Sequence, residues 1–202
     1  MPMQAPPPPE IEVVIVHPPR LPPLGGEAVF AVQQLDAETL KTAPRLDAAL
    51  KRAPGVSLFR RTGSDAANPT IQGLSLRGIA PSGAGRALVT LDGAPVNDPF
   101  GGWVIWSALP PEGLASATIV RGAGAGPYGA GALTGVVALE ERPAIEGLQA
   151  LDVALGQRGE GRAAAAFGTE GLLISAAAET SDGFTPVRGR ARGAADQLAD
   201  LE

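Results

Sequence analysis

Proline is concentrated at one end of the chain, and this uneven distribution limits what the chain can fold into. Nine of the 20 prolines lie at or before Pro23, including the run Pro6–Pro9. Because proline lacks a backbone N–H and fixes φ, such a stretch favours extended polyproline and cannot pack a core. We therefore predict a tail over residues 1–34, with folded structure after it.

The remaining residues must build a core largely from small side chains. The chain has 27 glycines and only 4% aromatic residues, so little apolar area can be buried per residue. No apolar run approaches the roughly 18 residues of a transmembrane helix, but barrel strands are shorter and only alternately apolar. The first ten residues lack the cationic and apolar parts of a secretory signal. An exported protein would therefore need a signal outside this sequence.

Charge and composition argue against several classes of protein. A net charge of −5 and a pI near 5.0 disfavour a nucleic-acid partner. The absence of cysteine excludes disulfides and thiolate metal sites, and His17 is the only histidine. No carboxylates have acid/base spacing, and no serine has a plausible histidine partner. We predict a protein that is not an enzyme and has no catalytic residues, metal site or cofactor.

The periodicity predicts an α+β, mainly β, protein in three parts. In the tail, Ile11–Val16 is strand-like; it is either a loose edge strand or linker, or a peptide that adds to a partner's sheet. Residues 35–143 are typical of a compact domain, with one helix capped by Thr42 and ended by Pro54-Gly55. Asp92-Gly93 indicates a tight turn between strands. In residues 144–202, three short strands at even spacing indicate a meander or barrel, followed by a polar segment from Ser181. The predicted strands are 56–59, 70–77, 87–91, 94–96, 117–120, 136–139, 151–155, 162–167 and 172–179, and a helical turn is predicted at 109–114.

Two loops invite a binding hypothesis. Gly124, Gly126 and Gly129 match the dinucleotide fingerprint G-x-G-x-x-G, but that motif must open a long helix. Pro127 lies inside the match and a strand follows shortly after it, so nucleotide binding is not expected. The second loop, 97–106, contains Trp103 and Trp106, which either anchor the loop in the core or form a ligand platform.

Four motifs in order resemble the plug domain of TonB-dependent outer-membrane receptors. They are Leu46–Val56, Leu76–Ile79, Ala87–Asp98, and Ala117–Gly122 with Pro127–Val137. The resemblance implies a plug with a small mixed β-sheet and short helices, held inside an antiparallel barrel of roughly 22 strands. Such receptors import scarce nutrients, such as ferric siderophores or cobalamin, with energy delivered by TonB. Residues 144–202 would then be the first strands of an incomplete transmembrane barrel.

The resemblance also assigns roles to residues. The TonB C-terminal domain would bind a TonB box at Glu12, Val13, Val14, Ile15 and Val16. Arg77 and Arg121 would pair with barrel glutamates as a latch between plug and barrel. The loops facing a nutrient ligand, such as a metal chelate, would include Ser64, Asp65, Asn68, Asn97, Asp98, Phe100, Trp103 and Trp106. Tight turns or close contacts would use Gly78, Asp92, Gly93, Gly122, Tyr128, Gly129 and Gly135.

The resemblance implies a place in the bacterial outer membrane, with the plug and TonB box facing the periplasm and the full barrel contacting lipid. Three strands cannot close a barrel, and open sheet edges are not viable in lipid. We therefore expect the chain to be part of a longer receptor. Two alternatives are a soluble periplasmic plug-like binding or signalling module, and a non-functional fragment of a truncated receptor gene.

Overall fold

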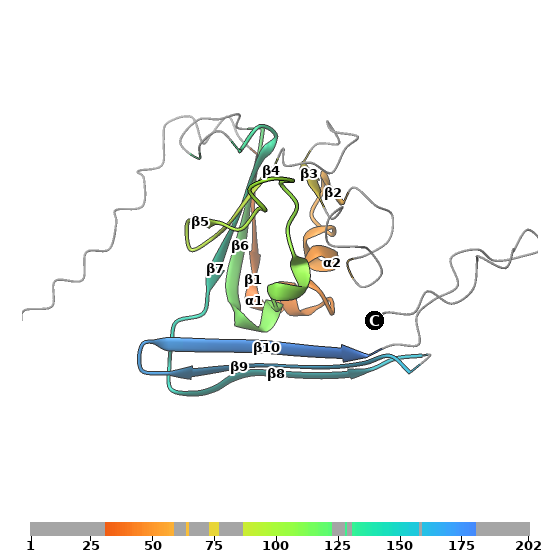
Figure 1. Ribbon diagram of the computed structural model, residues 1–202, viewed down its shortest axis with the longest axis vertical. Helices are drawn as coiled ribbons and strands as arrows, with labels where there is room; N and C mark the ends of the chain where they lie inside the picture. The colour runs from red at the N-terminus through yellow and green to blue at the C-terminus, as the bar shows by residue number, and fades with distance from the viewer. Residues whose placement is uncertain are drawn as a thin grey trace, which may run out of the picture.

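The computed structural model describes residues 31–58, 64, 73–76, 87–122, 128, 131–157 and 159–180. These residues form two parts (Figure 1). The first, which we call the body, contains a five-stranded sheet, a two-stranded sheet and four short helices. The second is a separate three-stranded sheet. The described residues contain no helix with the length and apolar character needed to cross a membrane.

The five-stranded sheet is mixed, as the sequence resemblance implies. Its strand order is β1-β6-β7-β4-β5, and only the β4–β7 pair is parallel. The strands are β1 (Ala31–Asp36), β4 (Ala87–Leu91), β5 (Ala94–Pro95), β6 (Leu114–Arg121) and β7 (Gly135–Glu141). Central strands β6 and β7 are rich in β-branched and small apolar residues, which suits strands buried on both faces.

Short elements cover one face of this sheet and close the core. They are α1 (Ala37–Lys41), α2 (Leu46–Leu50), β2 (Val56–Leu58), β3 (Leu74–Leu76) and the 3-10 helices η3 (Trp106–Ala108) and η4 (Pro111–Gly113). Leu40, Leu46 and Leu50 from the helices are fully buried with Ile119 and Leu139 from the sheet. The leucines at 46 and 50 lie one helical turn apart, so α2 presents both to the core.

The structure corrects two boundaries predicted from the sequence. The predicted helix from Thr42 to before Pro54-Gly55 is present only as α2, and Thr42 instead ends the preceding helix α1, where its hydroxyl donates to the Thr39 carbonyl at 2.6 Å. Pro44 explains why α1 does not continue into α2, because proline disfavours helical backbone at the preceding residue. The predicted tail over 1–34 is also too long, since β1 begins at Ala31 and pairs with β6. Polar and apolar residues alternate only weakly in this strand, so the sequence does not predict it.

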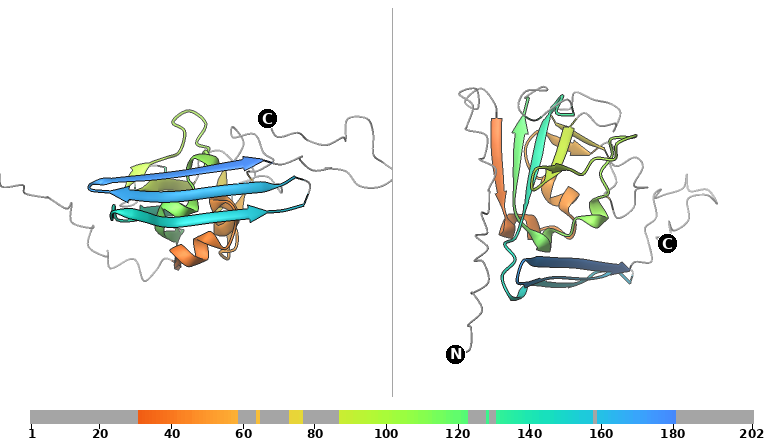
Figure 2. Two further views of the ribbon diagram at one scale, coloured as in Figure 1. Left: turned by 90° about the horizontal axis from the view of Figure 1, so that it is seen from below. Right: turned by 60° about the vertical axis from the view of Figure 1, so that its left-hand side comes forward.

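The second part is an antiparallel meander in the order β10-β9-β8. Its strands are β8 (Gly147–Leu155), β9 (Gly161–Thr169) and β10 (Leu172–Thr180), each somewhat longer than predicted. The meander runs crosswise to the strands of the body and lies against its lower end in Figure 1, below α1 and the 3-10 helices. The view from below shows the three strands side by side beneath the body (Figure 2).

The three-stranded sheet has an unusual distribution of side chains. Its apolar residues Leu151, Val153 and Leu155 are exposed, Leu155 by 89%. The residues that face the body are small or polar, such as Ala164, Ala166 and Arg162, and these are buried. The face turned away from the body is therefore apolar, and no part of the chain that the structure describes covers it.

Candidate functional site

The loop between β5 and η3 is held in place by one amide side chain. Asn97 Oδ1 accepts a hydrogen bond from the Val89 N–H at 2.7 Å. Its Nδ2 donates to the carbonyls of Ala87 at 3.2 Å and Gly102 at 3.0 Å. Asn97 thus ties the start of the loop and Gly102 within it to β4, and its side chain is used for structure.

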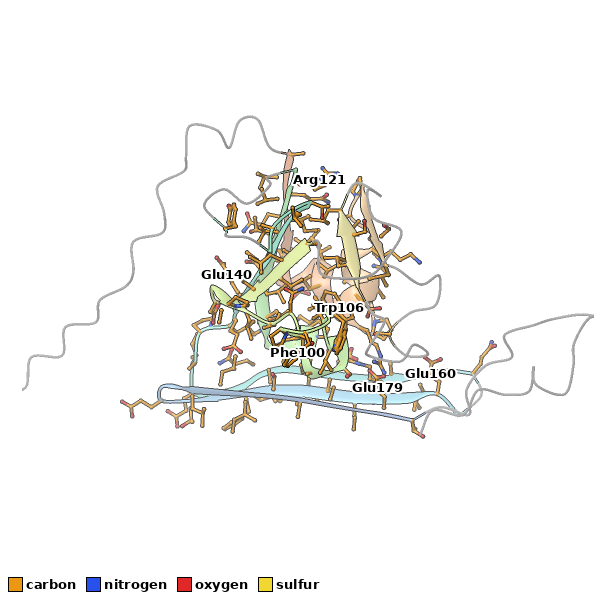
Figure 3. The ribbon with its side chains drawn as sticks, turned by 45° about the horizontal axis from the view of Figure 1, so that its top comes forward. Phe100, Trp106, Arg121, Glu140, Glu160 and Glu179 are labelled. Atoms are coloured by element: carbon orange, nitrogen blue, oxygen red, sulfur yellow. The ribbon has the colours of Figure 1, made fainter. Side chains whose placement is uncertain are left out.

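The tip of the same loop is a turn built on Asp98. Asp98 Oδ1 accepts from the N–H groups of Phe100 at 2.9 Å and Gly101 at 2.8 Å. The ring of Trp103 lies against Gly101, where a Cβ atom would come within 1.5 Å of a ring carbon. Phe100 is left 97% exposed, while Trp106 is 2% exposed in the core (Figure 3). A fixed turn with one projecting aromatic side chain suits contact with a ligand, since little ordering is needed on binding.

The two tryptophans of this loop therefore have different structural roles. Trp106 anchors the loop in the core and Trp103 shields the turn, so Phe100 is the aromatic side chain offered to solvent. Ser64 is also buried: its N–H and hydroxyl donate to the Asp47 carboxylate at 2.9 and 2.6 Å. Ser64 thus bonds to α2 through both its backbone N–H and its hydroxyl.

Arg121 ends β6 at the far end of the body from the three-stranded sheet (Figure 3). Its Nη1 donates to the carbonyl of Pro54, and the guanidinium lies against Gly55, whose φ of +80° brings the backbone close. Its partner among the described residues is thus a carbonyl of the body. A pairing of Arg121 with a barrel glutamate remains a prediction.

The Asp92-Gly93 turn lies where the sequence predicts it. Asp92 and Gly93 both have positive φ and join β4 to β5. Gly135 has φ +143°, and a Cβ atom there would lie 2.2 Å from the Val120 carbonyl oxygen. Several predicted site residues lie outside the described residues: Glu12, Val13, Val14, Ile15, Val16, Asp65, Asn68, Arg77, Gly78 and Gly129.

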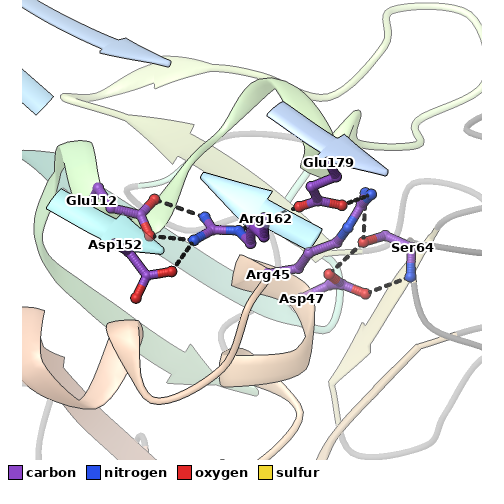
Figure 4. Close-up of polar contacts among 7 residues, drawn as sticks. All are labelled: Arg45, Asp47, Ser64, Glu112, Asp152, Arg162 and Glu179. Carbon is purple, nitrogen blue, oxygen red and sulfur yellow. Dashed lines mark hydrogen bonds and ion pairs between the residues drawn. The ribbon is translucent and has the colours of Figure 1, made fainter. Parts of the chain in front are cut away.

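The most extensive polar cluster of the described residues was not predicted from the sequence (Figure 4). Arg162 of β9 donates to both carboxylate oxygens of Glu112 in η4, at 2.8 and 2.9 Å. Its Nη1 also donates to Asp152 of β8 at 2.7 Å, and its Nε lies 3.3 Å from Glu179 of β10. The Arg162 and Glu112 side chains are 5% and 2% exposed. The sequence signal was a lone arginine on the small-residue face of a strand.

This cluster continues into the body through a second arginine. Glu179 also pairs with Nη2 of Arg45, and Nη1 of Arg45 lies 3.4 Å from the Ser64 hydroxyl, which donates to Asp47. A small cavity beside Arg45 and Arg162 is lined also by Trp106, Pro111 and Ala177. The cluster therefore spans the boundary between the body and the three-stranded sheet.

The chain resembles known proteins in both sequence and fold. Residues 26–136 match the sequence model of the TonB-dependent Receptor Plug Domain, and no relative is found among curated protein sequences. The fold is similar to the unliganded ferric citrate transporter FecA, with a TM-score of 0.55 and 22% identity over 74% of this chain and 25% of that one. The ferric yersiniabactin uptake receptor FyuA from Yersinia pestis gives 0.54 and 19%, over 79% and 26%. A variant of the ferric enterobactin receptor PfeA from Pseudomonas aeruginosa, in complex with enterobactin, gives 0.50 and 22%, over 67% and 22%.

The chain thus spans about a quarter of the length of these receptors. Identities of this size establish a shared fold and no more. The sequence model, in contrast, covers more than half of the 202 residues, with a match that begins just before β1 and ends in β7. On that basis the chain belongs to the TonB-dependent receptor plug domain family.

Proposed function

We propose that this chain is the plug region of an outer-membrane receptor that takes up a scarce nutrient with energy from TonB. The observation that carries the proposal is the match to the plug family over residues 26–136, which contains most of the body. In this function the body blocks a pore until TonB engages the N-terminal segment. The same family match supports a transport role rather than an enzymatic one.

The three-stranded sheet supports the membrane part of the proposal. Its alternation is that of a barrel wall, with apolar side chains on one face and small or polar ones on the other. Leu151, Val153 and Leu155 would face lipid, and the opposite face already contacts the body. In this reading residues 144–202 contain the first strands of a larger barrel.

An iron chelate is the cargo that we propose. FecA is named as a ferric citrate transporter, and FyuA as a ferric yersiniabactin uptake receptor. The loop at Phe100 supports a ligand contact, because Asp98 and Asn97 fix a turn that leaves one aromatic ring in solvent. An aromatic ring at a fixed position favours an amphipathic ligand over a bare ion.

Proline substitutions in the N-terminal segment test the proposed coupling to TonB. Glu12–Val16 would add as a strand to the sheet of the TonB C-terminal domain, and proline in such a strand removes a backbone donor. We expect Ile15→Pro in the full chain to weaken binding to a purified TonB C-terminal domain at least about tenfold, measured by titration calorimetry. Leu21→Pro, in the same Pro-rich tail but outside the box, is the matched control and should bind normally. Equal affinity of Ile15→Pro and the control would refute strand addition at this box.

A further inference from the structure

The body and the three-stranded sheet meet through charged groups rather than through an apolar seam. The contact centres on η4, which lies against all three strands of the sheet. The Arg162 guanidinium contacts three carboxylates, of which Glu112 belongs to the body and the other two to the sheet. Glu112 is therefore the group through which this arginine holds the body.

The surfaces around this ion pair fit closely. Inward-facing residues of β9 and β10 are small, including Ala164, Ala166 and Ser175, so η4 can approach the sheet backbone. A Cβ atom on Gly113 would lie 2.8 Å from Ser175 Oγ and 2.9 Å from Ser175 Cβ. Gly113 therefore accepts no side chain without a shift, and its lack of a Cβ atom lets η4 lie close to β10.

Further hydrogen bonds hold Glu112 and its neighbours in position. The Arg142 N–H donates to the Gly113 carbonyl at 2.9 Å, and Arg142 Nε donates to the Glu112 carbonyl at 2.8 Å. Because Arg142 follows β7 directly, η4 is fixed by the strand that leads toward β8. These two hydrogen bonds hold η4 in the position from which the Glu112 carboxylate meets Arg162.

We propose that Arg162 is a positioning residue that docks the three-stranded sheet on the body through Glu112. The acid lies on the body and the arginine on the sheet, which is the reverse of the polarity implied for Arg77 and Arg121. Arg121, at the other end of β6, bonds within the body. The inference concerns how the two parts are held together and does not rest on the proposed function.

A double-mutant cycle in the full chain tests the pairing. Breaking a buried pair on one side leaves the other charge uncompensated, whereas removing both charges does not. We expect Glu112→Gln and Arg162→Gln each to lower Tm by at least about 5 °C, and the double variant to lose clearly less than the sum. Glu38→Gln, which breaks the exposed pair between Glu38 and Lys41, is the control and should change Tm little. Additive losses would overturn the pairing.

Thiol labelling separates docking from general stability. The chain has no cysteine, so the near-isosteric variant Ser175→Cys carries a single thiol at the point where η4 lies against β10. We expect slow reaction of this thiol with a thiol reagent in the otherwise unchanged chain, and at least about tenfold faster reaction when Glu112→Gln is added. Equal rates in both backgrounds would overturn the proposal. Should either single variant fail to fold, recovery of folding in the double variant supports the pairing, and its absence refutes it.

Discussion

The body and the three-stranded sheet bury opposite kinds of side chain. In the body, Leu50, Ile119 and Leu139 are inside, at 1% exposure or less. In the three-stranded sheet, Leu155 and Val153 are outside, while Arg162 is inside with alanines. In the three-stranded sheet a period of two identifies the strands, but it does not say which face meets water.

This difference shows how each part is stabilised. The body buries leucine, isoleucine and valine on itself and so supplies its own hydrophobic driving force. The three-stranded sheet buries little apolar area against the body, and its contact depends on ion pairs and close-fitting small residues. Its apolar face therefore favours an apolar environment outside the chain.

One substitution in each part gives the largest expected difference between the body and the three-stranded sheet. Leu50→Ala should cost about 2–5 kcal/mol of unfolding free energy, because it opens a cavity in the body where Leu50 is fully buried. Leu155→Ala makes the same chemical change at a side chain that is 89% exposed and should cost less than about 0.5 kcal/mol. Urea unfolding of both variants, followed by circular dichroism, measures the two changes. Similar losses would mean that the exposed face is covered in solution and that the contrast between the parts is wrong.

A second pair of substitutions tests backbone fit in the two parts. Gly135→Ala should cost about 2 kcal/mol or more, because its φ is positive and the new Cβ atom would strike the Val120 carbonyl in the centre of the five-stranded sheet. Gly171→Ala, in the turn between β9 and β10, also has positive φ but meets no atom within 4 Å. It should cost about 1 kcal/mol, for the strained backbone alone. Thermal unfolding distinguishes the two, and an equal loss would show that the packing around Gly135 adjusts freely.

The sequence predicts most of the strands, because their apolar runs are bounded by glycine and proline. The segment Ala87–Leu91, the turn at Asp92-Gly93 and the return strand lie where those residues indicate. The family and its fold class are also predicted correctly, because four motifs occur in a fixed order. Such features are local in the sequence, so they can be identified from one sequence alone.

The features that the sequence does not predict depend on distant residues. Glu112 and Arg162 are 50 positions apart, and nothing near either residue specifies the other. Ser64 is buried because it bonds to Asp47, and Trp106 is buried because η3 packs into the core. The exposure of these two side chains could therefore not be judged from the composition of their loops. Strand β1 has one strongly buried residue, Leu35, and takes its conformation from pairing with β6. Tertiary contact decides each of these cases.

The smallest expected effect concerns the point where β1 leads into α1. The Thr39 hydroxyl and N–H lower the pKa of Asp36, whose carboxylate accepts from the Thr39 N–H at 2.8 Å. Since the folded pKa lies below the ordinary value, this carboxylate stabilises the body at pH values above about 4, and the contribution disappears as the pH falls through the lowered pKa. We expect Asp36→Asn to lower Tm slightly at pH 7, because asparagine keeps the cap but not the charge at the helix N-terminus.

The difference in Tm between Asp36→Asn and the unchanged chain should close toward pH 3, as recorded by calorimetry at several pH values. Glu170→Gln, at the exposed turn between β9 and β10, makes the same change of carboxylate to amide in the other part and corrects for the loss of one charge. A pH-independent difference for Asp36→Asn would show that the charge of Asp36 does not stabilise α1. Equal pH dependence in the two variants would show that the overall charge of the chain, and not the cap at Asp36, causes the change in Tm.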